Sequence, residues 1–191
     1  KTPLLLFVGK LIDVKAPQLL LRAFFALRER GIAAHLAFCG DGPLRGRLQE
    51  LCRGRGDVSF PGFVNQAELP ALYAAADALV LPSWRETFGI VVAEAMHAGL
   101  PVVLSSGVGC AEDLVPAVPP PGSAPSGLVF PVGEQGALLD CLRVLCEGED
   151  APARRQALIK GARARIATWT YTEATRGLID AVTTVLQDGI R

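Results

Sequence analysis

The sequence has no excess of charge of either sign. Its 191 residues include 19 lysines and arginines and 19 aspartates and glutamates, so the formal net charge is zero. A chain without a net field is not expected to hold nucleic acid or an anionic membrane through its overall charge. Any anionic ligand must therefore be bound locally, by a few well-placed groups.

Long apolar runs and targeting signals are also lacking. No apolar stretch approaches the roughly 18 residues of a membrane-spanning helix, and no basic segment precedes a short apolar one as in a signal peptide. The 5 cysteines are odd in number and show no Cys-x-x-Cys spacing, so we expect core thiols of a reduced, cytoplasmic protein. His, Cys and Asp do not cluster with metal-ligand spacing, and we predict no metal site and no cofactor.

What the sequence does contain is an alternation of short apolar runs with helical stretches. Each of the first five runs is followed by a segment of helical period or composition, which is typical of a doubly wound parallel sheet. We therefore predict one Rossmann-like α/β domain of about six strands with helices on both faces. The predicted strands are residues 4–8, 34–39, 58–63, 78–82, 101–105 and 127–131.

Three helical stretches follow the last predicted strand, at about residues 134–147, 152–167 and 172–187. A proline-rich segment at residues 116–127 precedes that strand, and we expect a loop there because proline cannot pair within a central strand. The first predicted strand begins within a few residues of Lys1, as it would in a fragment of a longer protein.

The turns after the strands are where a ligand is expected, because open parallel sheets bind ligands beyond the carboxyl ends of their strands. Two phosphate-binding motifs do not fit these turns. Val14 stands where a Walker loop needs its second glycine, and Arg45 stands where a dinucleotide fingerprint needs its third. We interpret Gly-Asp-Gly-Pro, residues 40–43, as a turn with Pro43 at the first helical position rather than as a ligand contact.

Four charged residues lie in these turns or in the helix that follows one of them. Lys10 and Lys15 follow the first strand, where two ammonium groups could clamp a diphosphate. Glu86 precedes a helix expected to begin near Phe88, and Glu94 lies about two turns inside it, roughly 12 Å further along. Two carboxylates so far apart suit a ligand with two hydroxyl-bearing ends and a charged middle. A nucleotide sugar has this shape.

A simpler alternative assigns these residues no ligand. Lys10 and Lys15 would then be solvated side chains, and Glu86 would only favour the helix N-terminus electrostatically. Against this, the helix around Glu94 is apolar on nearly every side, from Ile90 to Met96. We therefore expect the Glu94 carboxylate to have a partner.

The spacing Glu86-x7-Glu94, with Phe88-Gly89 inside it and "EAMHAGLPVV" after it, resembles the signature of the family-four retaining glycosyltransferases of GT-B fold. The segments "FVGKLIDVK", "GDGPLRGRL" and "VSFPGFV" are similar to further elements of that family, in the same order. The resemblance covers nearly the whole chain. It implies that residues 1–191 are a carboxyl-terminal donor-binding domain, one half of a GT-B fold, whose amino-terminal acceptor domain is absent from this chain.

The resemblance also implies roles for individual residues in a retaining, metal-independent hexosyltransferase, which needs no cofactor and takes a nucleoside-diphosphate sugar as donor substrate. The lysines would bind the diphosphate, Glu86 the transferred sugar and Glu94 the ribose, with Phe63 and Val64 bordering the base. The implied catalytic residues are Glu86, Lys15 and Lys10. The implied donor-binding residues are Gly9, Lys10, Lys15, Phe63, Val64, Glu86, Thr87, Phe88, Gly89, Ile90 and Glu94.

The partners implied are the donor and a sugar, lipid or other acceptor that the missing domain would hold, with peripheral membrane association of the full-length enzyme. The isolated domain would bind the donor without transferring the sugar, and the last helix would be less well held because the family's chain end crosses to the other domain. Two positions depart from the family pattern. Lys10 stands where arginine is commoner, and Cys110 replaces the second glycine of a Val-Gly-Gly turn.

Two other functions remain consistent with these residues. One is a nucleotide-sugar epimerase of related GT-B architecture, which would need further acid and base residues; the order of the motifs argues against it. The other is a non-catalytic nucleotide-binding module in which the carboxylates are remnants. Nucleotide-sugar titration combined with an assay for hydrolysis or transfer distinguishes the three.

Overall fold

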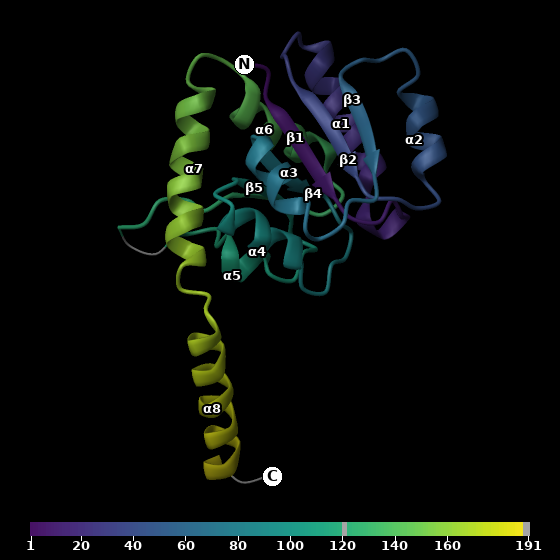
Figure 1. The fold of residues 1–191 in the computed structure, drawn as a ribbon. Coiled ribbons are helices and arrows are strands. Elements are labelled where there is room, and N and C mark those ends of the chain that lie inside the picture. Colours follow the sequence, from purple (N-terminus) through teal and green to yellow (C-terminus); the bar gives the residue numbers. More distant parts are fainter. Residues whose placement is uncertain (120–121, 189–191) are drawn as a thin grey trace.

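Six parallel strands form a sheet through the middle of the molecule, in the order β3-β2-β1-β4-β5-β6 (Figure 1). The computed structural model describes residues 1–119 and 122–188. The predicted α/β class and parallel sheet are confirmed, with each strand close to its expected bounds. The strands are β1 (Leu4–Val8), β2 (His35–Cys39), β3 (Val58–Gly62), β4 (Ala78–Leu81), β5 (Val102–Ser105) and β6 (Leu128–Phe130).

Helices cover both faces of the sheet, as predicted. Because successive side chains of a strand point to opposite faces, Leu5 and Phe7 of β1 belong to one core cluster while Leu6 and Val8 belong to the other. The first cluster includes side chains of α1 and α6, and the second includes side chains of α4 and α5. The helices are the 3-10 helix η1 (Asp13–Lys15), α1 (Pro17–Glu29), α2 (Arg45–Leu51), α3 (Leu69–Ala75), α4 (Ile90–His97), α5 (Ala111–Leu114), α6 (Gln135–Cys146), α7 (Ala151–Ile166) and α8 (Tyr171–Asp188).

The start of α4 differs from the prediction. The helix begins at Ile90 rather than near Phe88, because Gly89 precedes it with a φ of 89°. This is the left-handed region that glycine adopts readily and that a continuing helix cannot contain. Glu94 is therefore only one turn past the start of the helix.

The start of α2 also differs. This helix begins at Arg45, so Pro43 lies in the turn before it and not at the first helical position. The Leu44 amide donates to the Leu11 carbonyl oxygen at 3.0 Å, which ties this turn to the loop after β1. The turn is thus shaped by a neighbouring loop as well as by its own residues.

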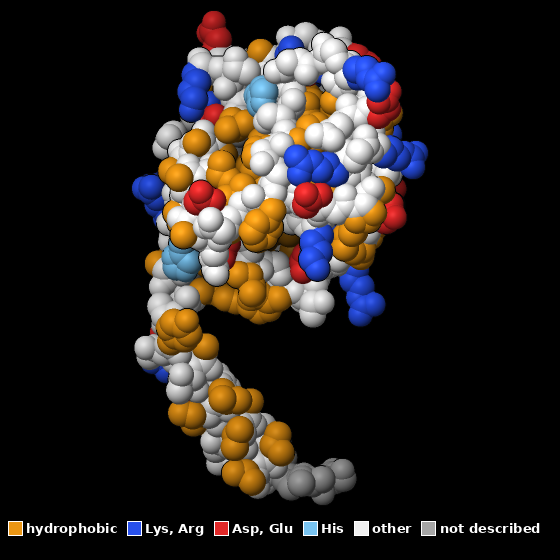
Figure 2. Space-filling model, turned by 45° about the vertical axis from the view of Figure 1, so that its right-hand side comes forward, with side chains coloured by type: hydrophobic (Ala, Val, Ile, Leu, Met, Phe, Trp, Pro, Cys, Tyr) orange, Lys and Arg blue, Asp and Glu red, His pale blue; other side chains and the backbone are white. Residues whose placement is uncertain are grey.

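The last helix, α8, extends away from the sheet (Figure 1). Figure 2 shows hydrophobic side chains along this helix. Leu178 is 66% exposed and Leu186 is 77% exposed. We call these two residues and their exposed neighbours Ile179, Val182 and Val185 the apolar stripe of α8.

The cysteines are free thiols, as predicted, and Cys39, Cys52 and Cys110 are buried. Burial raises the pKa of the Cys39 and Cys110 thiols to about 11. These thiols are therefore protonated at neutral pH and behave as small core side chains.

Gly40 should not tolerate a side chain, because a Cβ atom there would lie 1.9 Å from the Gly9 carbonyl oxygen. We expect Gly40→Ala to lower the free energy of unfolding by roughly 2–4 kcal/mol, measured by urea denaturation. Gly46→Ala is the matched control: its Cβ would meet no atom within 4 Å, and it should raise stability by up to about 1 kcal/mol. Equal stability of the two variants would contradict this packing.

Candidate functional site

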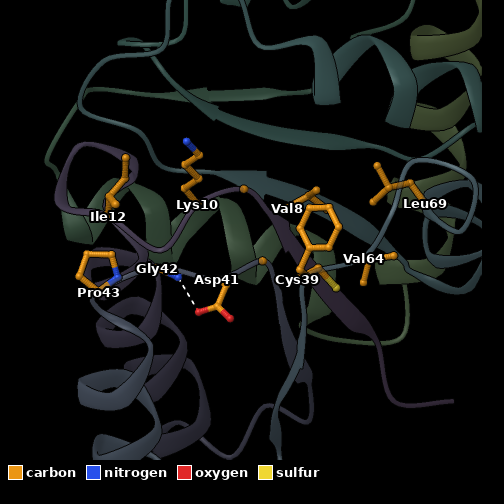
Figure 3. A pocket seen from close by; sticks show the side chains of 12 residues that line it. Val8, Lys10, Ile12, Cys39, Asp41, Gly42, Pro43, Val64 and Leu69 are labelled. Atoms are coloured by element: carbon orange, nitrogen blue, oxygen red, sulfur yellow. Dashed lines mark hydrogen bonds between the residues drawn. The ribbon is translucent and has the colours of Figure 1, made fainter.

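A cavity of about 700 Å³ opens at the carboxyl ends of β1, β2 and β3 (Figure 3). Its position agrees with the rule that open parallel sheets bind ligands beyond their carboxyl ends. The four predicted site residues among those that line it come from the loops after β1 and β3. The lining residues are Val8, Gly9, Lys10, Ile12, Cys39, Gly40, Asp41, Gly42, Pro43, Phe63, Val64 and Leu69.

The turn at residues 40–43 also forms part of the cavity wall. Gly42 lies so close to the loop after β1 that a Cβ there would be 2.6 Å from the Leu11 carbonyl oxygen. The Asp41 carboxylate accepts a hydrogen bond from the Gly42 amide at 2.7 Å (Figure 3) and pairs with Arg45 at 3.0 Å. The sequence signal was a pair of glycines directly after a buried strand, where backbone must approach backbone.

Lys15 and Glu86 form an ion pair between Nζ and Oε2. The two residues are 71 positions apart and come from η1 and from the loop between β4 and α4. The Trp84 amide donates to the Val14 carbonyl oxygen at 2.9 Å, which holds the two loops together beside the pair. The exposed fractions of the two side chains are 20% and 17%, so the pair is largely shielded from water.

The loop between β5 and α5 binds the backbone of Glu86. The Glu86 amide donates to the Gly107 carbonyl oxygen at 2.9 Å, and the Gly109 amide donates to the Glu86 carbonyl oxygen at 2.8 Å. A Cβ at Gly109 would lie 2.2 Å from the Thr87 carbonyl oxygen, so only glycine permits this approach. The backbone of Glu86 is therefore fixed before any ligand binds.

Two positive groups lie close together at this edge. Burial, and then the charge of the Lys10 ammonium group, lower the pKa of Lys15. Lys10 is exposed and lines the cavity, with its side chain directed away from Asp41 in Figure 3. An anion placed between the two ammonium groups would relieve their repulsion.

The N-terminus of α4 has no side-chain cap. Thr87 is exposed, Phe88 is 55% exposed and Ile90 is 62% exposed, while Gly89, directly before the helix, is buried. Free amides at a helix N-terminus, together with the helix dipole, favour a negatively charged group.

Glu94 has the partner that its apolar surroundings predicted. The Tyr73 hydroxyl donates to Glu94 Oε2 at 2.9 Å, and Tyr73 itself is buried in α3. Sequence reasoning missed Tyr73. The available signal was one tyrosine in a short apolar helix, whose hydroxyl needed a buried acceptor.

The structure thus places the predicted residues in three groups near the carboxyl ends of the strands. Gly9, Lys10, Phe63 and Val64 line the cavity, while Lys15 and Glu86 pair across neighbouring loops. The third group, residues 87–90 with Glu94, forms the entry and first turns of α4. Within residues 1–119 and 122–188, no three His, Cys, Asp or Glu side chains are placed to hold a metal ion. The same residues contain no helix that is long and apolar enough to cross a membrane.

Comparison with known families identifies the chain. Residues 1–165 match the family described as glycosyl transferases group 1. The chain belongs to this family. The chain is 33% identical over 173 residues to the sulfoquinovosyl transferase SQD2 of Arabidopsis thaliana, a match that covers 91% of this chain and 32% of the relative. The chain therefore spans about a third of the length of that curated relative.

Solved structures agree with the family and with one half of a GT-B fold. Sucrose-phosphate synthase of Thermosynechococcus elongatus is 26% identical, with a TM-score of 0.76 over 98% of this chain and 46% of that one. HepE of Anabaena, solved with UDP and glucose, is 21% identical, with a TM-score of 0.73 over 96% of this chain and 48% of that one. The second likeness shows a shared fold.

The Lys15–Glu86 pair should be energetically coupled. Lys15→Met and Glu86→Gln should each lower the free energy of unfolding by about 1–2 kcal/mol, because each leaves a shielded group without its counter-ion. The double variant should lose less than the sum, with a coupling of about 1 kcal/mol from a double-mutant cycle in urea.

The exposed pair Arg53–Glu50 is the matched control for this cycle, since its side chains are 77% and 61% exposed. Arg53→Met and Glu50→Gln should couple by less than about 0.5 kcal/mol. Additive losses at Lys15 and Glu86 would show that the two side chains do not interact in solution.

Proposed function

We propose that this chain is the carboxyl-terminal half of a retaining, metal-independent glycosyltransferase and binds a nucleoside-diphosphate sugar along the carboxyl edge of its sheet. The observation that carries the proposal is the arrangement of three kinds of group along that edge. An apolar cavity, two ammonium groups and two carboxylates held by different partners match the chemistry of such a donor from one end to the other.

The cavity suits the base and the ribose. Its wall includes the exposed Phe63 ring and Val64, and flat apolar surfaces of this kind take up a heterocyclic base. Glu94 is fixed through Tyr73, whose core cluster also contains the cavity residues Val8 and Cys39. A carboxylate in that place accepts hydrogen bonds from the ribose hydroxyl groups.

The diphosphate would be bound by Lys10, Lys15 and the first amides of α4. Burial, and then repulsion from the Lys10 ammonium group, lower the pKa of Lys15, and a phosphate group bound beside both lysines would relieve that repulsion. In the transfer step, negative charge builds up on the leaving diphosphate, so these groups stabilise the transition state more than the ground state.

Glu86 would hold hydroxyl groups of the transferred sugar while the anomeric bond breaks. Its backbone is fixed by Gly107 and Gly109 and its carboxylate by Lys15, so little ordering is needed when the donor binds. The acceptor hydroxyl oxygen forms the new bond to the anomeric carbon as the bond to the diphosphate oxygen breaks. A leaving phosphate oxygen takes the acceptor proton, and front-face attack retains the configuration.

The acceptor would be held by an amino-terminal domain outside this chain. The chain spans about a third of the sulfoquinovosyl transferase relative, and the apolar stripe of α8 provides a surface for such a domain to cover. Without that domain the diphosphate stays in contact with water, which weakens the lysine contacts, so we expect binding without transfer. The free cysteines suit a cytoplasmic location, from which the whole enzyme could reach a membrane surface and a lipid acceptor.

Substitution of Glu86 and substitution of Glu94 should affect the binding of two ligands differently. Glu94→Ala should weaken both a nucleoside diphosphate and its sugar conjugate by about 1–3 kcal/mol, because charged hydrogen bonds to ribose are lost. Glu86→Ala should leave nucleoside diphosphate binding nearly unchanged and abolish transfer by the full-length enzyme. Calorimetric titration with UDP, GDP and their glucose and mannose conjugates measures the binding of each.

The matched control is Glu29→Ala, since Glu29 is exposed at the end of α1, on the opposite edge of the sheet from the site. It should change no affinity. Equal effects of the Glu86 and Glu94 variants on both ligands would refute the separate roles of the two carboxylates, and no nucleotide binding at all would refute the proposed function.

Donor binding should survive the removal of divalent cations, because lysines and backbone amides neutralise the diphosphate. The affinity of the wild-type chain for UDP or GDP should be the same, within about twofold, in EDTA and in buffer with magnesium or manganese. A strict requirement for either cation would contradict this charge assignment.

A further inference from the structure

Tyr73 is buried in α3 and contacts a residue of the proposed donor site. It is 3% exposed, and its hydroxyl donates a hydrogen bond of 2.9 Å to Oε2 of Glu94 on α4. Burial, and then the hydrogen bond to Glu94, raise the pKa of Tyr73 above its ordinary value. The hydroxyl therefore keeps its proton at neutral pH and acts as a permanent donor.

Tyr73 belongs to a part of the core that extends to the cavity at the carboxyl ends of β1, β2 and β3. It belongs to the core cluster that contains Val8 and Cys39, and both of those residues also line the cavity. Leu69 lines the cavity as well and is four residues earlier on α3, so it shares a face of that helix with Tyr73. The hydrogen bond thus holds one oxygen of the Glu94 carboxylate against α3, the helix that also contributes Leu69 to the cavity wall.

This hydrogen bond restricts the Glu94 carboxylate. A glutamate side chain has several rotatable bonds, and each one that must be ordered on binding weakens the affinity. With Oε2 held by Tyr73, Oε1 and the remaining lone pair of Oε2 are presented in a fixed plane. Two adjacent hydroxyl groups of one sugar ring are bound best by an acceptor whose two oxygens are fixed in this way.

We propose that Tyr73 is a positioning residue that orients Glu94 towards the 2′- and 3′-hydroxyl groups of the donor ribose. The inference rests on the proposed function, in which Glu94 binds that ribose. If Tyr73 only joined α3 to α4, removing its hydroxyl would lower stability and leave the preference for ribose over deoxyribose unchanged. The preference is therefore the quantity to measure.

The first experiment compares Tyr73→Phe with the wild-type chain by calorimetric titration of UDP and GDP, each beside its 2′-deoxy counterpart. The wild type should prefer the ribonucleotide. Tyr73→Phe should bind the ribonucleotide about tenfold more weakly and the deoxynucleotide less than about threefold more weakly, so the preference for ribose shrinks. Tyr171→Phe is the matched control, because Tyr171 is 94% exposed on α8 and its loss should change neither affinity.

A second experiment leaves Tyr73 in place. The chain has 2 tyrosines, so incorporation of 3-fluorotyrosine gives two fluorine resonances, which Tyr171→Phe assigns. The Tyr73 resonance should shift when UDP or GDP is added and should shift less with the 2′-deoxy counterpart.

The outcomes separate this inference from the function on which it rests. A wild type that prefers ribose, with an unchanged preference in Tyr73→Phe, overturns the positioning role. If Tyr73→Phe does not fold, the fluorine experiment decides. A Tyr73 resonance that does not shift when the ribonucleotide is added overturns the positioning role. If the wild type binds no nucleotide, the assignment of the donor site is wrong. If it binds the ribonucleotide and the 2′-deoxynucleotide equally well, the assignment of Glu94 to the ribose is wrong.

Discussion

The ion pair between Lys15 and Glu86 joins the loops that follow β1 and β4, the two central strands of the sheet. In this strand order the chain leaves β1 towards one side and β4 towards the other, so the loops diverge and a crevice opens between them. Opposite charges on the two loops hold its sides at a fixed separation. The same contact places a cation and a carboxylate side by side.

Close backbone contacts build the rest of this edge. Gly40 approaches the loop after β1, and Gly109 approaches the loop after β4, each at a distance that a Cβ atom would not allow. Together with the Lys15–Glu86 pair, these contacts join the loops after β2, β1, β4 and β5, which are neighbouring strands of the sheet. A site made in this way depends little on side-chain ordering, so its polar groups are held in place before the ligand arrives.

The two carboxylates of this site lie close to the apolar core, and each has one polar partner. Glu86 pairs with the Lys15 ammonium group, and Glu94 accepts a hydrogen bond from the Tyr73 hydroxyl. Neither partner uses all the acceptor positions of its carboxylate. Each carboxylate is thus oriented by the protein and still able to accept further hydrogen bonds.

The sequence by itself determined the sheet, the strand bounds and the edge at which to search, because buried parallel strands and amphipathic helices leave regular apolar patterns in the chain. It also predicted that Glu94 needs a partner, since an apolar helix gives a carboxylate no water. Only the tertiary structure decided that the partner is Tyr73, that Lys15 meets Glu86 across 71 positions, and that the turn at residues 40–43 lines a cavity. Contacts between distant loops depend on strand order and loop geometry, and neither leaves a periodic pattern in the sequence.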